Sequence, residues 1–161
     1  DPVRFVKGFY SIDGGGTWTE AVPLGGTDVT DLAAPAGGAN YTFNWDPVTS
    51  GLMGQADDVL VRLVAYPDHG NQAGHLADLN QWASSSGTST PFRARGIQIR
   101  VMDGVTPVQG ATVYRLASGM VTGQPFADSS GDPYTTDGSG YLQGRGQLQS
   151  GDELVALAPK A

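Results

Sequence analysis

The chain has 161 residues, of which 24 are glycine and 10 are proline, and this proportion argues against long helices. Its net charge of −7 excludes a general surface for nucleic acid or anionic membranes, and its lack of cysteine excludes disulfides and thiolate metal sites. Fourteen aspartates stand against two glutamates. Because aspartate favours turns over helix interiors, this composition predicts an all-β chain. No run is apolar for long enough to predict a membrane span.

The first half of the chain contains short apolar alternations, bounded by Gly, Pro, Asp or Ser, that predict half-buried strands. These predicted strands cover residues 3–12, 17–22, 40–45 and 58–66. In the third, Tyr41, Phe43 and Trp45 are expected to point the same way, into a sandwich core. The fourth is apolar on both faces and is predicted to be a central strand, in which Arg62 needs a partner or an open face.

Residues 67–90 break the alternation and are predicted to form a long loop. The loop contains one predicted helical turn, with Leu76, Leu79 and Trp82 at three-residue spacing. Loops of this length are usually functional or flexible. Here we expect the three apolar side chains to anchor the loop as a plug over one end of a sandwich.

A second series of predicted strands follows the loop. It covers residues 91–95, 97–102, 111–116, 134–136, 141–148 and 153–158. The first of these closes one domain and the next, beginning at Ile97, opens another, which places the boundary near Gly96. The sequence thus predicts two domains, residues 1–95 and residues 96–161, joined with almost no linker.

One motif has the spacing S-x-D-x-G-x-T-W, on Ser11, Asp13, Gly15, Thr17 and Trp18, and resembles an Asp-box hairpin. Asp13 and Ser11 are expected to bond to turn amides, the glycines to adopt positive φ, and Trp18 to pack back on the hairpin. In sialidases and related propellers the motif recurs in several blades as a structural turn. A single copy, without an arginine cluster for an acidic sugar, argues for a structural role and against glycoside hydrolysis.

Residues 3–95 are similar to fibronectin type III-like or immunoglobulin-like modules of bacterial surface proteins. The segments FYSIDGGGTW, YTFNWD, DDVLVRLVAY and TPFRAR carry this resemblance. Residues 96–161 resemble a carboxypeptidase regulatory-like or collagen-adhesin B-type sandwich of the transthyretin-like kind, on GIQIRVMDG, PVQGATVYRL, TTDGSGYLQG and GDELVALAP. The two resemblances imply tandem β-sandwich, Ig-like domains that serve as rigid spacers, adhesion domains or assembly units.

Some collagen-adhesin B-type domains carry an isopeptide bond between a lysine and an asparagine or aspartate. This chain has only Lys7 and Lys160, and Arg100 stands in the opening strand of the second domain, where a reactive amine would be needed. Because a guanidinium stays protonated and cannot act as that nucleophile, we do not expect an isopeptide bond here.

Three aspartates lie on adjacent turns near the end of the chain. Asp128, Asp132 and Asp137 offer carboxylate oxygens that could bind calcium, which takes six to eight such ligands. Their spacing matches no EF-hand loop, and Asp-Gly and Asp-Pro pairs are ordinary turn formers. The turn interpretation is therefore favoured, and no other cofactor is expected.

Catalytic groupings are incomplete in the sequence. The two histidines, His69 and His75, both lie in the long loop, and a metal site there would need a further ligand such as Asp68 or Asp78. No G-x-S-x-G nucleophile turn occurs, and the glycines at 14–16 lack the lysine of a phosphate-binding loop. These residue types predict that the protein is not an enzyme.

Together these observations predict a non-enzymatic structural module or subunit of an extracellular surface protein or appendage, acting in a stalk, in adhesion or in filament assembly. Its expected partners are other protein modules or copies of itself, paired through strand edges at residues 2–9 and 153–161. The alternative is a carbohydrate-binding accessory module of a secreted enzyme, in which Tyr66 and Trp82 form the candidate patch for a polysaccharide. A third possibility is a spacer stiffened by calcium.

Overall fold

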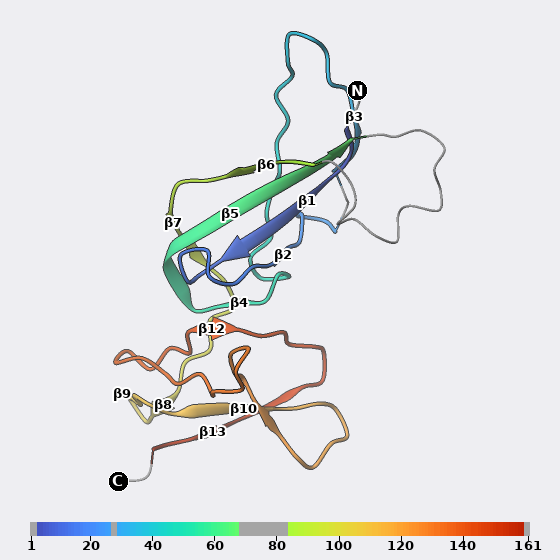
Figure 1. Ribbon diagram of the computed structural model, residues 1–161. Helices are drawn as coiled ribbons and strands as arrows, with labels where there is room; N and C mark the ends of the chain where they lie inside the picture. The colour runs from blue at the N-terminus through green and yellow to red at the C-terminus, as the bar shows by residue number, and fades with distance from the viewer. Residues whose placement is uncertain (1–2, 27–28, 68–83, 160–161) are drawn as a thin grey trace. The chain divides into compact units, whose positions relative to one another are not determined.

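The computed structural model describes residues 3–26, 29–67 and 84–159, and these residues form strands and turns without a helix (Figure 1). The prediction of an all-β chain is confirmed. The helical turn predicted around Leu76, Leu79 and Trp82 lies outside the described residues.

The chain divides into two compact units and passes between them more than once. The first unit comprises residues 1–46 and 58–92, and the second unit comprises residues 47–57 and 93–161. The sequence predicts a single boundary near Gly96 instead, which would place residues 47–57 in the first domain. Apolar alternation indicates where strands lie but not which strands share a core, so it could not assign this segment.

Backbone pairing holds the crossing segment in the second unit. Strand β4 (Leu52–Met53) pairs antiparallel with β12 (Gly144–Arg145). In addition, the Ile97 amide donates to the Leu52 carbonyl (2.7 Å), and the Gly54 amide donates to the Ile97 carbonyl (2.8 Å). Two segments that follow much later in the chain therefore fix β4, although it is only two residues long.

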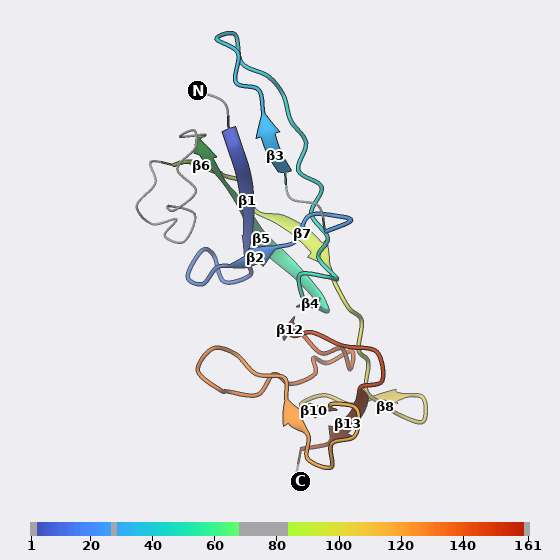
Figure 2. The ribbon, with the colours of Figure 1, turned by 90° about the vertical axis from the view of Figure 1, so that its right-hand side faces the viewer.

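A six-stranded sheet, with the strand path β2-β1-β5-β6, is the largest sheet among the described residues (Figures 1 and 2). Its strands are β1 (Val3–Ser11), β2 (Thr19–Ala21), β3 (Val29–Leu32), β5 (Gln55–Pro67), β6 (Ser85–Thr88) and β7 (Phe92–Arg95). β3 also pairs with β1, and β7 with β5. The run predicted as a central strand lies within β5, which pairs with β1 along most of its length, from Pro67 opposite Val3 to Leu60 opposite Ser11.

Residues 40–45, predicted as a strand, form none in the structure. Two of their aromatic side chains still cover the sheet: the Trp45 ring lies 5.0 Å from the ring of buried Tyr10, and Phe43 lies against β1. Tyr41 is half exposed, so the three rings do not share one buried face as predicted. The segment packs through side chains without joining a strand ladder, and alternation alone does not distinguish these two cases.

Strand β6 lies within the segment that is predicted to be a loop. It pairs antiparallel with β5, from Thr88 opposite Arg62 to Ser85 opposite Ala65. Its four residues, with the sequence SSGT, are all exposed and show no apolar alternation. Backbone hydrogen bonds rather than burial hold such an edge strand, so the pattern could not reveal it.

The second unit contains short strands. Besides β4 and β12, these are β8 (Met102–Asp103), β9 (Thr106–Pro107), β10 (Thr112–Leu116), β11 (Gln124–Pro125) and β13 (Glu153–Leu157). β10 lies between β11 and β13, and β8 pairs with β9. The strands predicted at 111–116 and 153–158 correspond to β10 and β13. Those predicted at 97–102, 134–136 and 141–148 form mainly isolated bridges.

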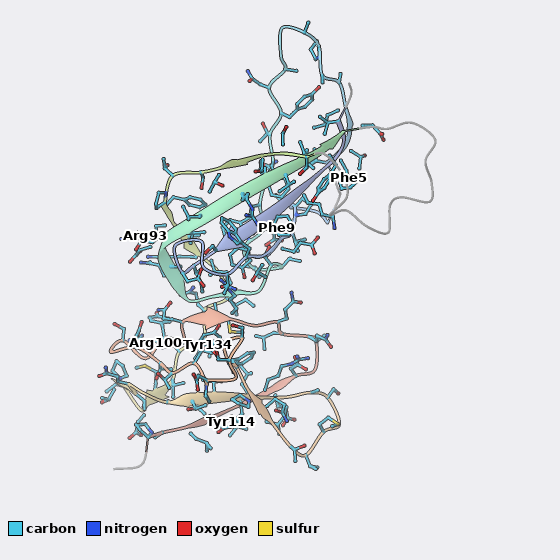
Figure 3. All side chains as sticks on the ribbon, in the orientation of Figure 1. Phe5, Phe9, Arg93, Arg100, Tyr114 and Tyr134 are labelled. Atoms are coloured by element: carbon cyan, nitrogen blue, oxygen red, sulfur yellow. The ribbon has the colours of Figure 1, made fainter. Side chains whose placement is uncertain are left out.

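An apolar core holds the second unit together. Its buried members are Met53 of β4, Val113 of β10, Phe126 and Leu142. Partly buried side chains pack against them, namely Ile97, Ile99, Val101, Leu148 and Tyr134, the last of which is labelled in Figure 3. Met53 therefore belongs to the core of the second unit, whereas the predicted boundary near Gly96 would place it in the first domain.

Candidate functional site

The turn that follows β1 is held by side chains of the S-x-D-x-G-x-T-W motif. The Ser11 hydroxyl donates to Asp13 Oδ1 (2.6 Å) and accepts from the Gly15 amide (2.8 Å). The Thr17 amide donates to Asp13 Oδ1 (2.9 Å), and the Thr17 hydroxyl donates to Asp13 Oδ2 (2.5 Å). Gly14 and Gly15 adopt φ of 70° and 94°, which favours glycine. The Asp13 carboxylate is thus engaged by its own turn.

The last residue of this motif lies against the central arginine of β5. The Arg62 guanidinium stands 4.2 Å from the Trp18 ring centre and 5.6 Å from the Phe9 ring centre. Phe9, which is labelled in Figure 3, is opposite Arg62 in the sheet. Its Nε is buried and has no hydrogen-bond partner among the described residues. Cation–π contact with two rings is therefore how Arg62 is accommodated within an apolar strand.

Only half of the candidate sugar patch lies in the described residues. Tyr66 is 8% exposed and stacks on Phe5, with ring centres 4.7 Å apart. Its ring therefore offers little free area to a sugar. Trp82, the other member of the patch, lies outside the described residues.

Two of the three aspartates considered as calcium ligands, Asp128 and Asp137, use their carboxylates to accept hydrogen bonds from their own turns. Asp128 Oδ1 accepts from the Ser130 amide (2.8 Å) and the Asp132 amide (3.0 Å). Asp137 forms a separate set of bonds, described below. Across residues 3–26, 29–67 and 84–159, no three or more His, Cys, Asp or Glu side chains gather as a metal-binding group. His69 and His75, with Asp68 and Asp78, lie outside those ranges.

A polar pocket of about 220 Å³ lies in the second unit. Three of its lining side chains are the amides Gln55, Gln98 and Gln143. The others are one cation, Arg95, one anion, Asp137, and the hydroxyl residues Ser139 and Tyr141. A lining of this composition can donate and accept hydrogen bonds but carries one formal charge of each sign.

Hydrogen bonds between the lining residues fix their orientation. Gln143 Oε1 accepts from the backbone N–H of Gln55 (2.7 Å), and Gln143 Nε2 donates to Asp137 Oδ2 (2.8 Å). Gln98 Nε2 donates to two backbone carbonyls, at 2.8 and 3.0 Å. Arg95 Nε donates to Gln55 Oε1 (2.8 Å). Because each planar group is held at one edge, its remaining polar atoms have a defined direction.

Asp137 is the most heavily bonded residue of the pocket. Its Oδ1 accepts from the amides of Ser139 (2.8 Å) and Tyr141 (3.0 Å). Burial raises the pKa of Asp137, but the hydrogen bonds from Gln143, Tyr141 and Ser139 and the charge of Arg100 outweigh burial, so the pKa lies below its ordinary 3.8. The carboxylate is therefore ionised at neutral pH.

This lowered pKa predicts that acid destabilises the second unit. A carboxyl whose pKa is lower in the folded protein than in the unfolded chain stabilises the fold above the unfolded pKa, and this contribution is lost as pH falls through the folded pKa. The unfolding free energy from urea titrations should thus decrease from about pH 5 towards pH 3 and below, and decrease less in Asp137→Asn. Asp103→Asn, on exposed β8, is the control. Equal slopes for Asp137→Asn and the unmodified chain would contradict this assignment.

No pattern in the sequence predicts the pocket. Its glutamines come from the start of β5, from the segment after β7 and from the segment before β12, which are far apart along the chain. Glutamine has no fixed motif spacing for such a role. Of the lining residues, the sequence pattern indicates only Asp137 as a candidate ligand, and it does so for calcium.

Comparison of the chain with models of protein families, with curated proteins and with solved structures finds no match in any of the three. In the ranges that the structure describes, no helix has the length and apolar character to cross a membrane. Function must therefore be inferred from the geometry of the two units.

Proposed function

We propose that the chain is a non-enzymatic structural module, made of two β-sandwich, Ig-like units, of an extracellular surface protein or appendage. The all-β architecture with two compact units supports this proposal. We propose the extracellular or cell-surface location from the resemblance of the sequence to modules of bacterial surface proteins. In this role the chain assembles through strand edges with a second copy of itself.

The observation that carries the proposal is the apolar, exposed edge strand β13. It pairs with β10 on one side, and no described strand pairs with its other side. Leu154, Val155 and Leu157 are 42%, 44% and 54% exposed, so apolar side chains meet solvent on both faces of the strand. Edge strands are usually protected by lysine, proline or a bulge, and β13 (ELVAL) has none of these. Its free edge is thus suited to pair with another strand.

A second copy of β13 fits this edge. Antiparallel pairing of two identical strands is self-complementary and follows two-fold symmetry, the commonest symmetry of protein assemblies. The only charge in β13 is Glu153, at one end of the strand. In an antiparallel pair centred on β13, the two glutamates stand at opposite ends, and the apolar residues meet in the middle. This pairing would join the three-stranded sheets of the two copies into one six-stranded sheet.

Sedimentation velocity from micromolar to millimolar protein tests the assembly. We expect the unmodified chain to form dimers as concentration rises, and Val155→Lys/Leu157→Lys to remain monomeric because lysines on an edge strand oppose pairing. The matched control is Val105→Lys/Val121→Lys, which adds the same charge at positions 92% and 95% exposed outside β13 and should dimerise normally. A monomeric unmodified chain at millimolar concentration, or an edge variant that still dimerises, would refute the proposal.

A further inference from the structure

We propose that the polar pocket of the second unit binds one neutral monosaccharide unit of a glycan. This inference goes beyond the structural role and does not depend on it, because the pocket does not include β13. It rests on the charge balance of the lining, on the polar atoms left open and on the size of the pocket.

The charge balance favours a neutral ligand. Arg95 and Asp137 contribute opposite charges, and the five other lining residues are uncharged amides or hydroxyls. An anion would meet the ionised Asp137 carboxylate in the same pocket. A ligand ammonium would meet a carboxylate that already accepts three hydrogen bonds from Ser139, Tyr141 and Gln143. A neutral ligand avoids both conflicts.

The open polar atoms favour a ligand with several hydroxyl groups. No described residue hydrogen-bonds to Gln98 Oε1, to the Nη atoms of Arg95, or to the hydroxyls of Ser139 and Tyr141. These atoms comprise an acceptor, several donors and two groups that do both. A sugar hydroxyl also donates and accepts, so vicinal hydroxyls can satisfy this mixed set, whereas a ligand of donors or acceptors alone cannot.

The pocket is already arranged for such a ligand. Its amides and guanidinium are oriented by their bonds to each other, to Asp137 and to backbone carbonyls, which reduces the entropy lost on binding. Arg100, which is labelled in Figure 3, supports one wall from outside. Its Nε donates to the Ser139 carbonyl (3.0 Å), and its guanidinium lies 5.1 Å from the Tyr141 ring centre. The volume of about 220 Å³ is far above the roughly 10–15 Å³ that a single water needs, which leaves room for a ligand of the size of one sugar ring.

NMR titration of the whole chain tests the ligand class. The probes are methyl α-glucopyranoside, methyl β-galactopyranoside and methyl α-mannopyranoside, and the comparison probes are acetate and glycine. We expect saturable shifts of the side-chain amide signals of Gln98 and Gln143 with at least one glycoside, at millimolar affinity. Acetate and glycine should not shift these signals to saturation. Saturation by acetate or glycine, or by none of the three glycosides, would overturn the proposal.

Two variants test the position of the site. Gln98→Ala and Tyr141→Phe each remove one open polar group and should weaken binding roughly five- to tenfold, as expected for one hydrogen bond. The matched control is Gln147→Ala, since Gln147 bonds only to the exposed Thr49 carbonyl and does not line the pocket. Melting curves establish that the variants are folded. Unchanged affinity in both pocket variants, or equal weakening in the control, would contradict the assignment.

The edge variant separates this proposal from the proposed assembly. Val155→Lys/Leu157→Lys should bind the glycoside with the affinity of the unmodified chain. Loss of dimers with intact binding supports both proposals independently. Loss of binding in the edge variant would refute the independence of the pocket from β13.

Discussion

Replacing Gly96 with alanine is expected to lower the unfolding free energy of the second unit by about 3 kcal/mol. A Cβ at this position would lie 1.7 Å from the Leu52 carbonyl oxygen and 2.4 Å from its carbon. Neither backbone can easily move, because the Gly96 amide donates to the Gly54 carbonyl (3.0 Å) and the Ile97 amide donates to the Leu52 carbonyl. The clash therefore separates β4 from the segment that holds it in the second unit.

Urea unfolding followed by NMR signals of the second unit measures this effect. Gly138→Ala is the matched control, because a Cβ there would have no atom within 4 Å and the residue does not adopt positive φ. We expect the control to change stability by no more than about 0.5 kcal/mol. If Gly96→Ala were as stable as Gly138→Ala, the close packing of residue 96 on β4 would be wrong.

Replacing Thr136 with valine is expected to lower the unfolding free energy by about 2–3 kcal/mol. Thr136 is 3% exposed, and its hydroxyl donates to the Val108 carbonyl (2.6 Å) and accepts from the Ala111 amide (2.9 Å). Valine keeps the shape but leaves the amide of fully buried Ala111 without this acceptor. The loss should loosen the turn that leads into β10.

Thr135→Val is the control for this substitution, because the neighbouring threonine is exposed. Hydrogen exchange of the Ala111 amide provides a local measurement besides urea unfolding. We expect faster exchange at Ala111 in Thr136→Val and an unchanged rate in Thr135→Val. Similar exchange rates in both variants would show that the hydroxyl does not protect this amide.

Features encoded by neighbouring residues could be predicted from the sequence. The run at 58–66 has apolar residues on both faces and lies within β5, and the residues of the S-x-D-x-G-x-T-W motif bond to one another within one turn. The all-β character follows from the same local preferences of glycine, proline and aspartate. Such features require no knowledge of which distant segments meet.

Features that depend on distant partners could not be predicted. Phe43 and Trp45 are partly buried against the sheet without being in a strand, and the polar strand β6 exists through its pairing with β5. The polar pocket likewise requires Gln55, Gln98 and Gln143 to come together from separate segments. In each case tertiary packing decides the structure, and a residue's type and spacing carry no record of the packing partner.

The interleaved assignment of residues 47–57 bears on how the protein is made. Synthesis from the N-terminus normally lets one domain fold before the next emerges. Here the nascent chain delivers Met53 before residues 58–92 of the first unit, while its core partners Val113 and Leu142 follow much later. Met53 therefore lacks these core partners while residues 58–92 of the first unit are being translated. Because each unit consists of two separate segments, cleavage of the chain at any single peptide bond cannot yield both units intact.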